Sequence, residues 1–124
     1  PTDAQWQYAC RGNSKGYRYG DINEIAWFKE NSGGQSHEVK MKKENDFGLF
    51  DMIGNVWEWC GDMYGAYTDE PQTNPTGNPD GNTLVVRGGS WDNGGSNCRS
   101  AFRGSTPSFM CDNFLGFRLV LPKK

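Results

Sequence analysis

Four cysteines and a single histidine are the residues whose side chains could carry redox or transition-metal chemistry. Cys10, Cys60, Cys98 and Cys111 lie 50, 38 and 13 residues apart along the chain. No pair has the CxxC spacing of zinc and thiol-exchange motifs, and His37 is the one imidazole. The spacing therefore does not favour a zinc site. Two disulfides and four free thiols both remain open, and with them the redox compartment.

The run between Asp92 and Phe114 is the second stretch with potential for function. It fits neither the period of a helix nor that of a strand. Most of its residues are small and polar, yet Phe102, Phe109, Met110 and Phe114 are distributed among them. Apolar side chains on irregular backbone are expected to be partly exposed, although the alternative is that they are ordinary core residues. We expect a ligand-binding patch in which one or two aromatic residues each contribute roughly 2 kcal/mol or more.

The composition is that of one small, turn-rich domain. The 124 residues include 17 glycines and 6 prolines, only 35% are hydrophobic, and the mean hydropathy is −0.81. Five Trp, five Tyr and seven Phe must supply much of the core, since each large ring buries roughly 150 to 250 Å².

Charge and hydropathy exclude two classes of partner. A net charge of −2 offers no basic patch for nucleic acid. No apolar run approaches the roughly 20 residues that span a bilayer, and the start, Pro1 to Asp3, lacks the features of a signal peptide. We therefore expect neither nucleic acid binding nor membrane insertion.

One helix and three short strands are the regular elements that the sequence predicts. Thr2 and Gln5 form a capping box, and Arg11-Gly12 supplies a basic last turn and a glycine stop. The apolar face of this single predicted helix would consist of Ala4, Trp6, Tyr8 and Ala9. Strands are predicted over residues 56–60, 83–87 and 117–121, with the last two pairing through Val85 and Leu119. Irregular loops are predicted over residues 12–50, pinned by Tyr17, Tyr19, Trp27 and Phe28, and over residues 71–81.

Four blocks, in the right order and across nearly the whole chain, resemble the formylglycine-generating-enzyme (sulfatase-modifying factor) domain family. They are residues 1–9, 47–59, 87–91 and 116–118. The resemblance implies a single domain over residues 1–124 with an α+β, C-type lectin-like fold. That fold would have little regular secondary structure, short antiparallel strands and one clear N-terminal helix. The family's usual chain is longer, so the resemblance implies a minimal version that lacks N-terminal elements.

The enzymes of this family oxidise a substrate cysteine with copper and oxygen, using two cysteines just upstream of the segment that matches residues 99–103. Counting back from that segment places Ser90 and Gly95 where those thiols would be, and neither residue can bind Cu(I). Cys98 is nearby but out of register. The related ergothioneine-pathway iron enzymes need several histidines, and this chain has one. We therefore expect a domain that is not an enzyme and requires no cofactor, with the copper- and oxygen-dependent enzyme as the alternative.

The chain also resembles the variable proteins of diversity-generating retroelements, which carry this domain and end in the same order of blocks. In them, adenine-directed mutagenesis rewrites asparagine codons between fixed scaffold residues. The fixed residues would be Trp91, Cys98, Arg99, Ser100, Ala101, Arg103, Pro107 and Leu115 to Arg118.

The diversified, ligand-binding region would be residues 91–114. Its variable positions would be Asp92, Asn93, Gly94, Ser96, Asn97, Phe102, Gly104, Ser105, Thr106, Ser108, Phe109, Met110, Cys111, Asp112, Asn113 and Phe114. Asn, Asp, Ser, Gly, Thr, Phe and Cys dominate these positions, and all are reachable from an asparagine codon by changing adenines. Met110 is not reachable in that way.

A structural calcium ion is a further implication of the enzyme resemblance. Asn55 and Glu58, with the carbonyls of Gly54 and Val56, match the place where the resembled enzymes hold it, and oxygen ligands suit a hard cation. The alternative is that Glu58 caps buried backbone or pairs with an arginine. An anion site is one interpretation of four arginines, Arg87, Arg99, Arg103 and Arg118. We expect instead that they stack on Trp57, Trp59 or Trp91 and pair with Asp51 or Asp62.

Together these features predict a non-enzymatic protein that displays a variable surface to a macromolecular ligand, namely a protein on a host or target surface. Virion-surface and cell-surface locations are both compatible with that role. A fixed structural interaction domain is the remaining alternative, and the oligomeric state is open.

Overall fold

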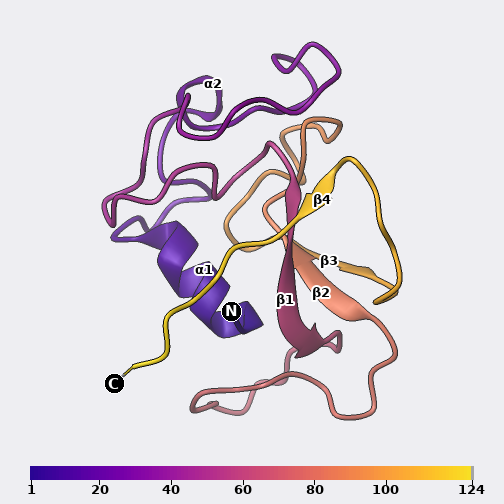
Figure 1. Ribbon diagram of the computed structural model, residues 1–124. Coiled ribbons are helices and arrows are strands. Elements are labelled where there is room, and N and C mark those ends of the chain that lie inside the picture. Colours follow the sequence, from indigo (N-terminus) through magenta and orange to yellow (C-terminus); the bar gives the residue numbers. More distant parts are fainter. Residues whose placement is uncertain (124) are drawn as a thin grey trace.

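The computed structural model describes residues 1–123, in which a small sheet lies beside one helix and long irregular loops complete the domain (Figure 1). Lys124, the last residue of the predicted domain, lies outside the described residues. The helices are α1 (Asp3–Arg11) and α2 (Ile22–Ile25). The strands are β1 (Trp57–Met63), β2 (Leu84–Arg87), β3 (Arg103–Thr106) and β4 (Leu115–Gly116). Neither helix within residues 1–123 is long and apolar enough to cross a membrane.

Helix α1 begins and ends as predicted. The Thr2 side chain accepts a hydrogen bond from the Gln5 backbone, and the Gln5 side chain accepts one from the Thr2 backbone. Gly12 ends the helix with a positive φ of 56°. The predicted apolar face is wrong in part, because Tyr8 is 70% exposed.

The face of α1 that packs on the sheet combines Trp6 and Cys10 with the polar Asp3, and all three are buried. These residues are spaced i, i+3 and i+7, so they lie on one side of the helix. Apolar periodicity missed Asp3, because its burial depends on ion pairs with the sheet. The sequence also missed α2, a single turn capped by the Asp21 side chain and too short to show a period.

The sheet has the strand order β3-β2-β1-β4. β2 pairs antiparallel with β1 and with β3, as predicted, whereas β4 pairs parallel with β1. The register places Glu58 opposite Arg87 and Arg87 opposite Arg103. Charged side chains from three strands therefore form one row across the sheet, on the face that α1 covers.

Two strand predictions differ from the structure. The strand predicted over residues 117–121 is absent, and its pairing with Val85 through Leu119 does not form; Phe117 and Leu119 are 72% and 84% exposed. Their β propensity is high, but strand formation needs a partner, and β4 ends at Gly116. Conversely, β3 forms within the run for which no strand was predicted. Its residues have little β propensity of their own, and pairing with β2 supplies the ladder.

The core gathers small and sulfur-containing side chains around a few large ones. Its buried members are Trp6, Cys10, Ile25, Ala26, Phe28, Met52, Ile53, Cys60, Val85 and Cys98, with Tyr19 packed against them. Tyr17 was expected to pin the neighbouring loops, but it is exposed. All four cysteines are free thiols, which settles the alternative between disulfides and thiols.

Candidate ligand-binding surface

None of the positions predicted to be variable is fully buried. The exposed ones are Asp92, Ser96, Ser105, Ser108, Phe109, Met110, Cys111, Asp112 and Asn113. The half-buried ones are Asn93, Gly94, Asn97, Phe102, Gly104, Thr106 and Phe114. Among the interleaved residues predicted to be fixed, Cys98 and Ser100 are fully buried, whereas Ala101 is exposed and Arg99, Arg103 and Pro107 are half-buried.

Phe109 is the most exposed of the four apolar residues singled out in this run, at 83%. Met110 is also exposed, and Phe102 and Phe114 are half-buried. The expectation that these side chains are partly exposed is therefore confirmed, and none is an ordinary core residue. An aromatic ring held at the surface of a loop is the kind of group that anchors protein interfaces.

The fold brings the two ends of the predicted region together. The indole Nε1 of Trp91 donates to the carbonyl of Asn113 at 3.3 Å, and the backbone N–H of Trp57 donates to the carbonyl of Phe114 at 2.7 Å. The turns after Trp91 and the loop before β4 are thus neighbours, with β3 leading from one to the other. These two segments, about twenty residues apart in sequence, therefore form one continuous surface.

Two of the predicted variable residues have inward-directed roles. The Asn93 side chain accepts hydrogen bonds from the backbone N–H and the hydroxyl of Ser90, at 3.0 and 2.7 Å. A Cβ atom on Gly104 would lie 3.0 Å from Val86 Cγ2 and 3.3 Å from Trp57 Cζ3. Asn93 therefore closes a turn, and position 104 has room for little more than glycine.

Trp57 is a half-buried neighbour of this surface that the sequence did not assign to it. Its ring lies 6.0 Å from that of Phe102 and next to Gly104. Glu58 faces α1, so the strand alternation turns Trp57 to the opposite face, on the side of Phe102. The alternation of side chains between the two faces of the strand over residues 57–60 is a signal for this position. It could be used only if the position of residues 102–106 in the sheet were known.

Two buried thiols next to the candidate surface, Cys98 and Cys10, are poorly suited to redox chemistry. Burial raises the pKa of the Cys98 thiol to about 11, although the nearby Arg18 partly opposes that rise. Burial likewise raises the pKa of Cys10 to about 11, and a hydrogen bond with Ser100 partly offsets that rise. A buried thiol with a raised pKa is a weak nucleophile and a weak metal ligand at neutral pH. Ser90 is buried, and its hydroxyl bonds Asn93.

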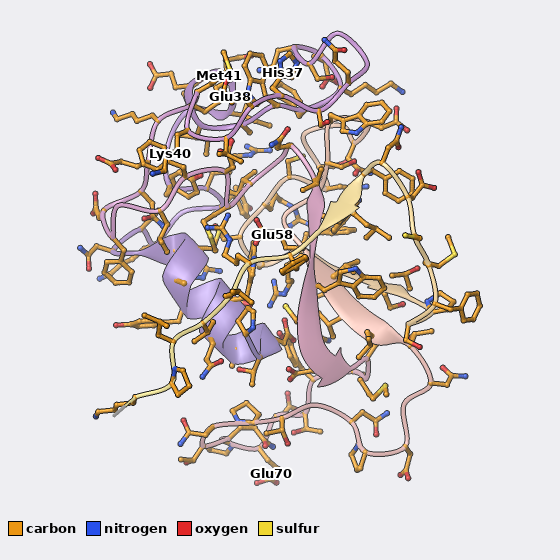
Figure 2. The ribbon with its side chains drawn as sticks, in the orientation of Figure 1. His37, Glu38, Lys40, Met41, Glu58 and Glu70 are labelled. Atoms are coloured by element: carbon orange, nitrogen blue, oxygen red, sulfur yellow. The ribbon has the colours of Figure 1, made fainter. Side chains whose placement is uncertain are left out.

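Asn55 and Glu58 do not fit a calcium ion in this arrangement. Both Glu58 oxygens accept hydrogen bonds from the Arg118 guanidinium at 2.7 Å, and Oε2 also accepts from the Trp6 indole at 2.8 Å. Figure 2 shows Glu58 in the interior, between α1 and the strands. The Asn55 side-chain oxygen accepts from the His37 backbone, and the Asn55 carbonyl accepts from the Trp91 backbone. A cation would have to displace Arg118.

Asp51, which the sequence did not name as a ligand, has a buried oxygen, Oδ1, without a hydrogen-bond partner. Its other oxygen accepts from the Lys40 backbone at 2.9 Å. Within residues 1–123, no group of three or more His, Cys, Asp or Glu side chains is arranged to hold a metal ion. Calcium binding is untested, and the side chains of Asn55 and Glu58 are already engaged by other partners.

The ion-pair partners of the arginines differ from the predicted Asp51 and Asp62, but the alternative that Glu58 pairs with an arginine is confirmed. Arg87 and Arg103 pair with Asp3, and Arg118 pairs with Glu58, so neither Asp51 nor Asp62 takes part in the ion pairs among the described residues. The aromatic partners are also different: Arg87 lies over Trp6, Arg103 over Tyr64 and Tyr67, and Arg99 over Phe102. Sequence spacing carries no signal for partners so far apart along the chain.

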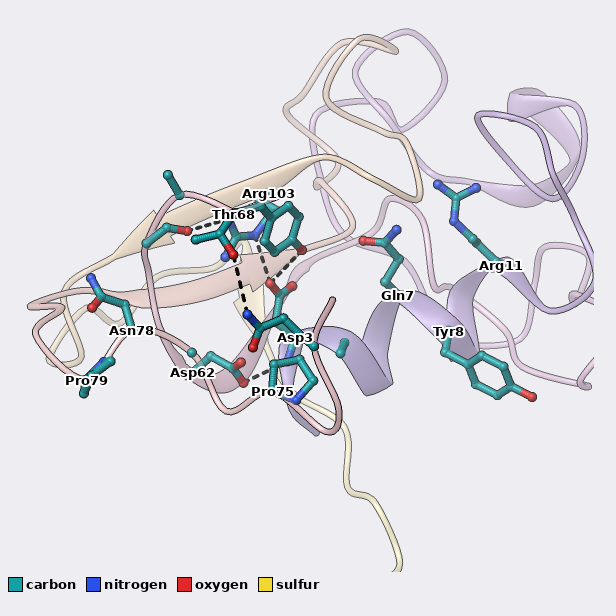
Figure 3. Close-up of a pocket in the computed structure, with 16 residues that line it drawn as sticks. Asp3, Gln7, Tyr8, Arg11, Asp62, Thr68, Pro75, Asn78, Pro79 and Arg103 are labelled. Carbon is teal, nitrogen blue, oxygen red and sulfur yellow. Dashed lines mark hydrogen bonds and ion pairs between the residues drawn. The ribbon is translucent and has the colours of Figure 1, made fainter. Parts of the chain in front are cut away.

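A cavity of about 840 Å³ lies between α1 and the loop of residues 65–79 (Figure 3). Asp3, Tyr67 and Arg103 form its hydrogen-bonded floor. None of the predicted variable positions lines this cavity. The candidate surface is therefore the outer face of loops and β3, and the cavity is a separate feature.

Comparison with known proteins identifies the family. The model of the sulfatase-modifying factor enzyme 1-like domain matches residues 1–123, and the chain belongs to this family. It is 34% identical over 140 residues to the formylglycine-generating enzyme of Streptomyces coelicolor, covering 95% of this chain and 45% of that protein. It is 32% identical to the inactive C-alpha-formylglycine-generating enzyme 2 of Bos taurus, covering 95% of this chain and 42% of that protein.

Among solved structures, variable protein 1 of Treponema denticola is similar, with a TM-score of 0.90 and 34% identity over 94% of this chain and 45% of that one. The predicted family, the C-type lectin-like fold and the resemblance to variable proteins are thereby confirmed. The chain spans less than half the length of each of these three proteins.

Proposed function

We propose that this domain is a non-enzymatic binding domain whose residues 91–114 present a variable surface to a macromolecular target, namely a protein on a host or target surface. The observation that carries the proposal is the division within that region. None of the predicted variable positions is fully buried, whereas Cys98 and Ser100 between them are. The similarity to a variable protein supports the same reading.

The division has a physical rationale. Side chains such as Phe109 and Asp112 can change without touching the core, because they are exposed. A backbone that is already ordered before binding loses little conformational entropy on binding, so a new set of side chains can yield a usable binder on the same fold. The exposed aromatic residue would provide most of the binding free energy.

A comparison of DNA sequences tests variability directly. The DNA that encodes residues 91–114 should have a nearby, nearly identical non-coding copy. The two sequences should differ only at positions where the copy has an adenine, and a reverse transcriptase gene should lie close by. Differences should fall at the codons of the predicted variable positions and spare those of the predicted fixed residues, including Cys98 and Ser100. If the flanking genome holds no such copy, the proposal fails, and a fixed structural interaction domain becomes the better explanation.

A second candidate function is oxidation of a substrate cysteine with copper and oxygen, favoured by the identity with the formylglycine-generating enzyme of Streptomyces coelicolor. Titration of the reduced protein with Cu(I) against a competing chelator distinguishes the two. The binding domain should not compete for Cu(I), because Ser90 and Gly95 stand where the thiol pair is expected. Tight binding that Cys98→Ser abolishes would favour the enzyme.

A further inference from the structure

Arg18 lies in the irregular segment that precedes α2, far in sequence from the loop it contacts. Its Nε donates to the carbonyl of Cys98 at 2.7 Å, and its Nη2 donates to the carbonyl of Gly95 at 2.5 Å. Among residues 1–123, Arg18 forms an ion pair with no carboxylate. Its half-buried charge is therefore directed at two backbone carbonyls, which makes these hydrogen bonds charge-assisted.

Besides Arg18, the backbone between residues 93 and 98 is held by the neighbouring Arg99, whose Nε donates to the Ser96 carbonyl at 2.6 Å, and by contacts within the loop. It contains the adjacent glycines Gly94 and Gly95, and its own hydrogen bonds are short turns, from Asn97 to Gly94 and from Cys98 to Gly95. The Gly95 carbonyl accepts from both the Cys98 backbone and Arg18. Without the Arg18 guanidinium, the Gly95 carbonyl would keep only the turn bond from Cys98, so this end of the loop would be less restrained.

The start of the same loop is held in a similar way. The Lys29 backbone donates to the Asn93 carbonyl at 3.0 Å, and the Ser32 hydroxyl donates to the Trp91 carbonyl at 2.8 Å. The Ser100 backbone donates to the carbonyl of Tyr17, next to Arg18. All of these contacts end on backbone atoms of residues 91–100, so they do not depend on which side chains stand there.

The two residues whose carbonyls Arg18 contacts, Gly95 and Cys98, are absent from the predicted variable set. A Cβ atom at position 95 would lie 3.3 Å from Arg18 Nη2 and 3.4 Å from Ile22 Cδ1, so a larger side chain there would press on the guanidinium. Cys98 is fully buried. The variable positions therefore surround the Arg18 contact without including it.

We propose that Arg18 is a positioning residue that fixes the backbone of residues 93–98, so that this loop keeps one conformation whatever its variable side chains are. The importance of this role for binding rests on the function proposed above, whereas the fixing of the loop does not. The two parts are therefore tested separately.

The first test compares Arg18→Ala with the unmodified protein and with Arg11→Ala as a matched control. Arg11 also donates to a backbone carbonyl, that of Gly16, but has no contact with the loop. Hydrogen exchange of the amides of Asn97 and Cys98 should become about tenfold faster in Arg18→Ala, because two charge-assisted hydrogen bonds are lost. A pulse of iodoacetamide, read by mass spectrometry, should label Cys98 faster while Cys10 and Cys60 stay protected.

Two outcomes would overturn the proposal. In one, exchange and Cys98 labelling in Arg18→Ala equal those of the unmodified protein. In the other, Cys10 and Cys60 become reactive in parallel with Cys98, which would mean that Arg18 stabilises the whole fold and not the loop. Arg18→Lys should restore only part of the protection against hydrogen exchange and labelling. A lysine ammonium group cannot reproduce the two parallel hydrogen bonds that the guanidinium donates to two carbonyls.

The second test uses lysozyme as a defined probe. Libraries randomised at the exposed positions of residues 92–112 are displayed on yeast in the Arg18 and Arg18→Ala backgrounds and selected for lysozyme binding. Binders should be about tenfold rarer in the Arg18→Ala background. Equal recovery in both backgrounds would contradict a role in binding. If neither background yields binders while hydrogen exchange is still faster in Arg18→Ala, the proposed function is contradicted and the positioning role of Arg18 is supported.

Discussion

Arg103 and Asp3, 100 residues apart in sequence, are joined by a hydrogen-bonded ion pair of 2.9 Å between Nε and Oδ2. The other Asp3 oxygen is bonded by the fully buried Arg87. One carboxylate at the start of α1 therefore holds two strands of the sheet, including β3, which lies within the predicted variable region. The scaffold of the candidate surface depends on this cluster.

Replacing Asp3 with Asn should be strongly destabilising. The amide keeps the shape of the carboxylate but leaves Arg87 and Arg103 as buried charges without a counter-charge, at a cost of about 3 to 5 kcal/mol. Urea denaturation measures the free energy of unfolding. Asp112→Asn, at an exposed position, is the control and should change it by less than about 0.5 kcal/mol. Similar losses for both variants would show that the cluster contributes little.

Stability should fall at alkaline pH because of the buried thiols. Burial raises the pKa of Cys10 and Cys98 to about 11 and that of Cys60 to about 12, from the ordinary value of 9.0. Folded thiols therefore keep their protons above pH 9, where those of the unfolded chain ionise. The folded state binds more protons in that range, so stability is complete below about pH 9 and declines as the pH rises towards 11.

Each such thiol should contribute a slope of roughly 1.4 kcal/mol per pH unit. Unfolding by urea between about pH 8 and about pH 10.5, with reductant present, measures that slope. Cys60→Ala should have a shallower slope than the unmodified protein, whatever its stability at neutral pH. Cys111→Ala removes an exposed thiol and should leave the slope unchanged. Identical slopes in all three proteins would show that the buried Cys60 thiol does not cause the loss of stability at alkaline pH.

Position 104 should tolerate less variation than position 105. Leucine at 104 would collide with Val86 and Trp57, and overpacking of that kind costs about 1 to 3 kcal/mol. Ser105→Leu changes the neighbouring exposed residue of the same strand and should cost less than about 0.5 kcal/mol. Thermal unfolding of the two variants compares them. Equal melting temperatures would return Gly104 to the freely variable set.

Calcium should leave the melting temperature unchanged. Glu58 is occupied by Arg118 and Trp6, and Asn55 by the backbone of His37. Thermal unfolding with excess calcium and with a chelator provides the comparison. A rise in melting temperature with calcium would contradict this expectation. Its loss in Asp51→Asn would then identify the unpartnered Asp51 oxygen as a ligand.

Local sequence determined the features that depend on near neighbours. The capping box from Thr2 to Gln5 fixed the start of α1, since its hydrogen bonds span three residues. The exposure of Phe109 followed from small polar neighbours on an irregular backbone. The order of the four blocks was enough to identify the family.

Tertiary structure alone decided what depends on residues far apart in the chain. Asp3 is buried only because Arg87 and Arg103 reach it from the sheet, and Arg18 reaches the loop across 77 residues to Gly95. β3 exists because β2 pairs with it, whereas residues 117–121, with greater β propensity, have no such strand. Periodicity and propensity describe what a segment can do by itself. Ion pairs and strand pairing need a partner whose position only the folded chain supplies.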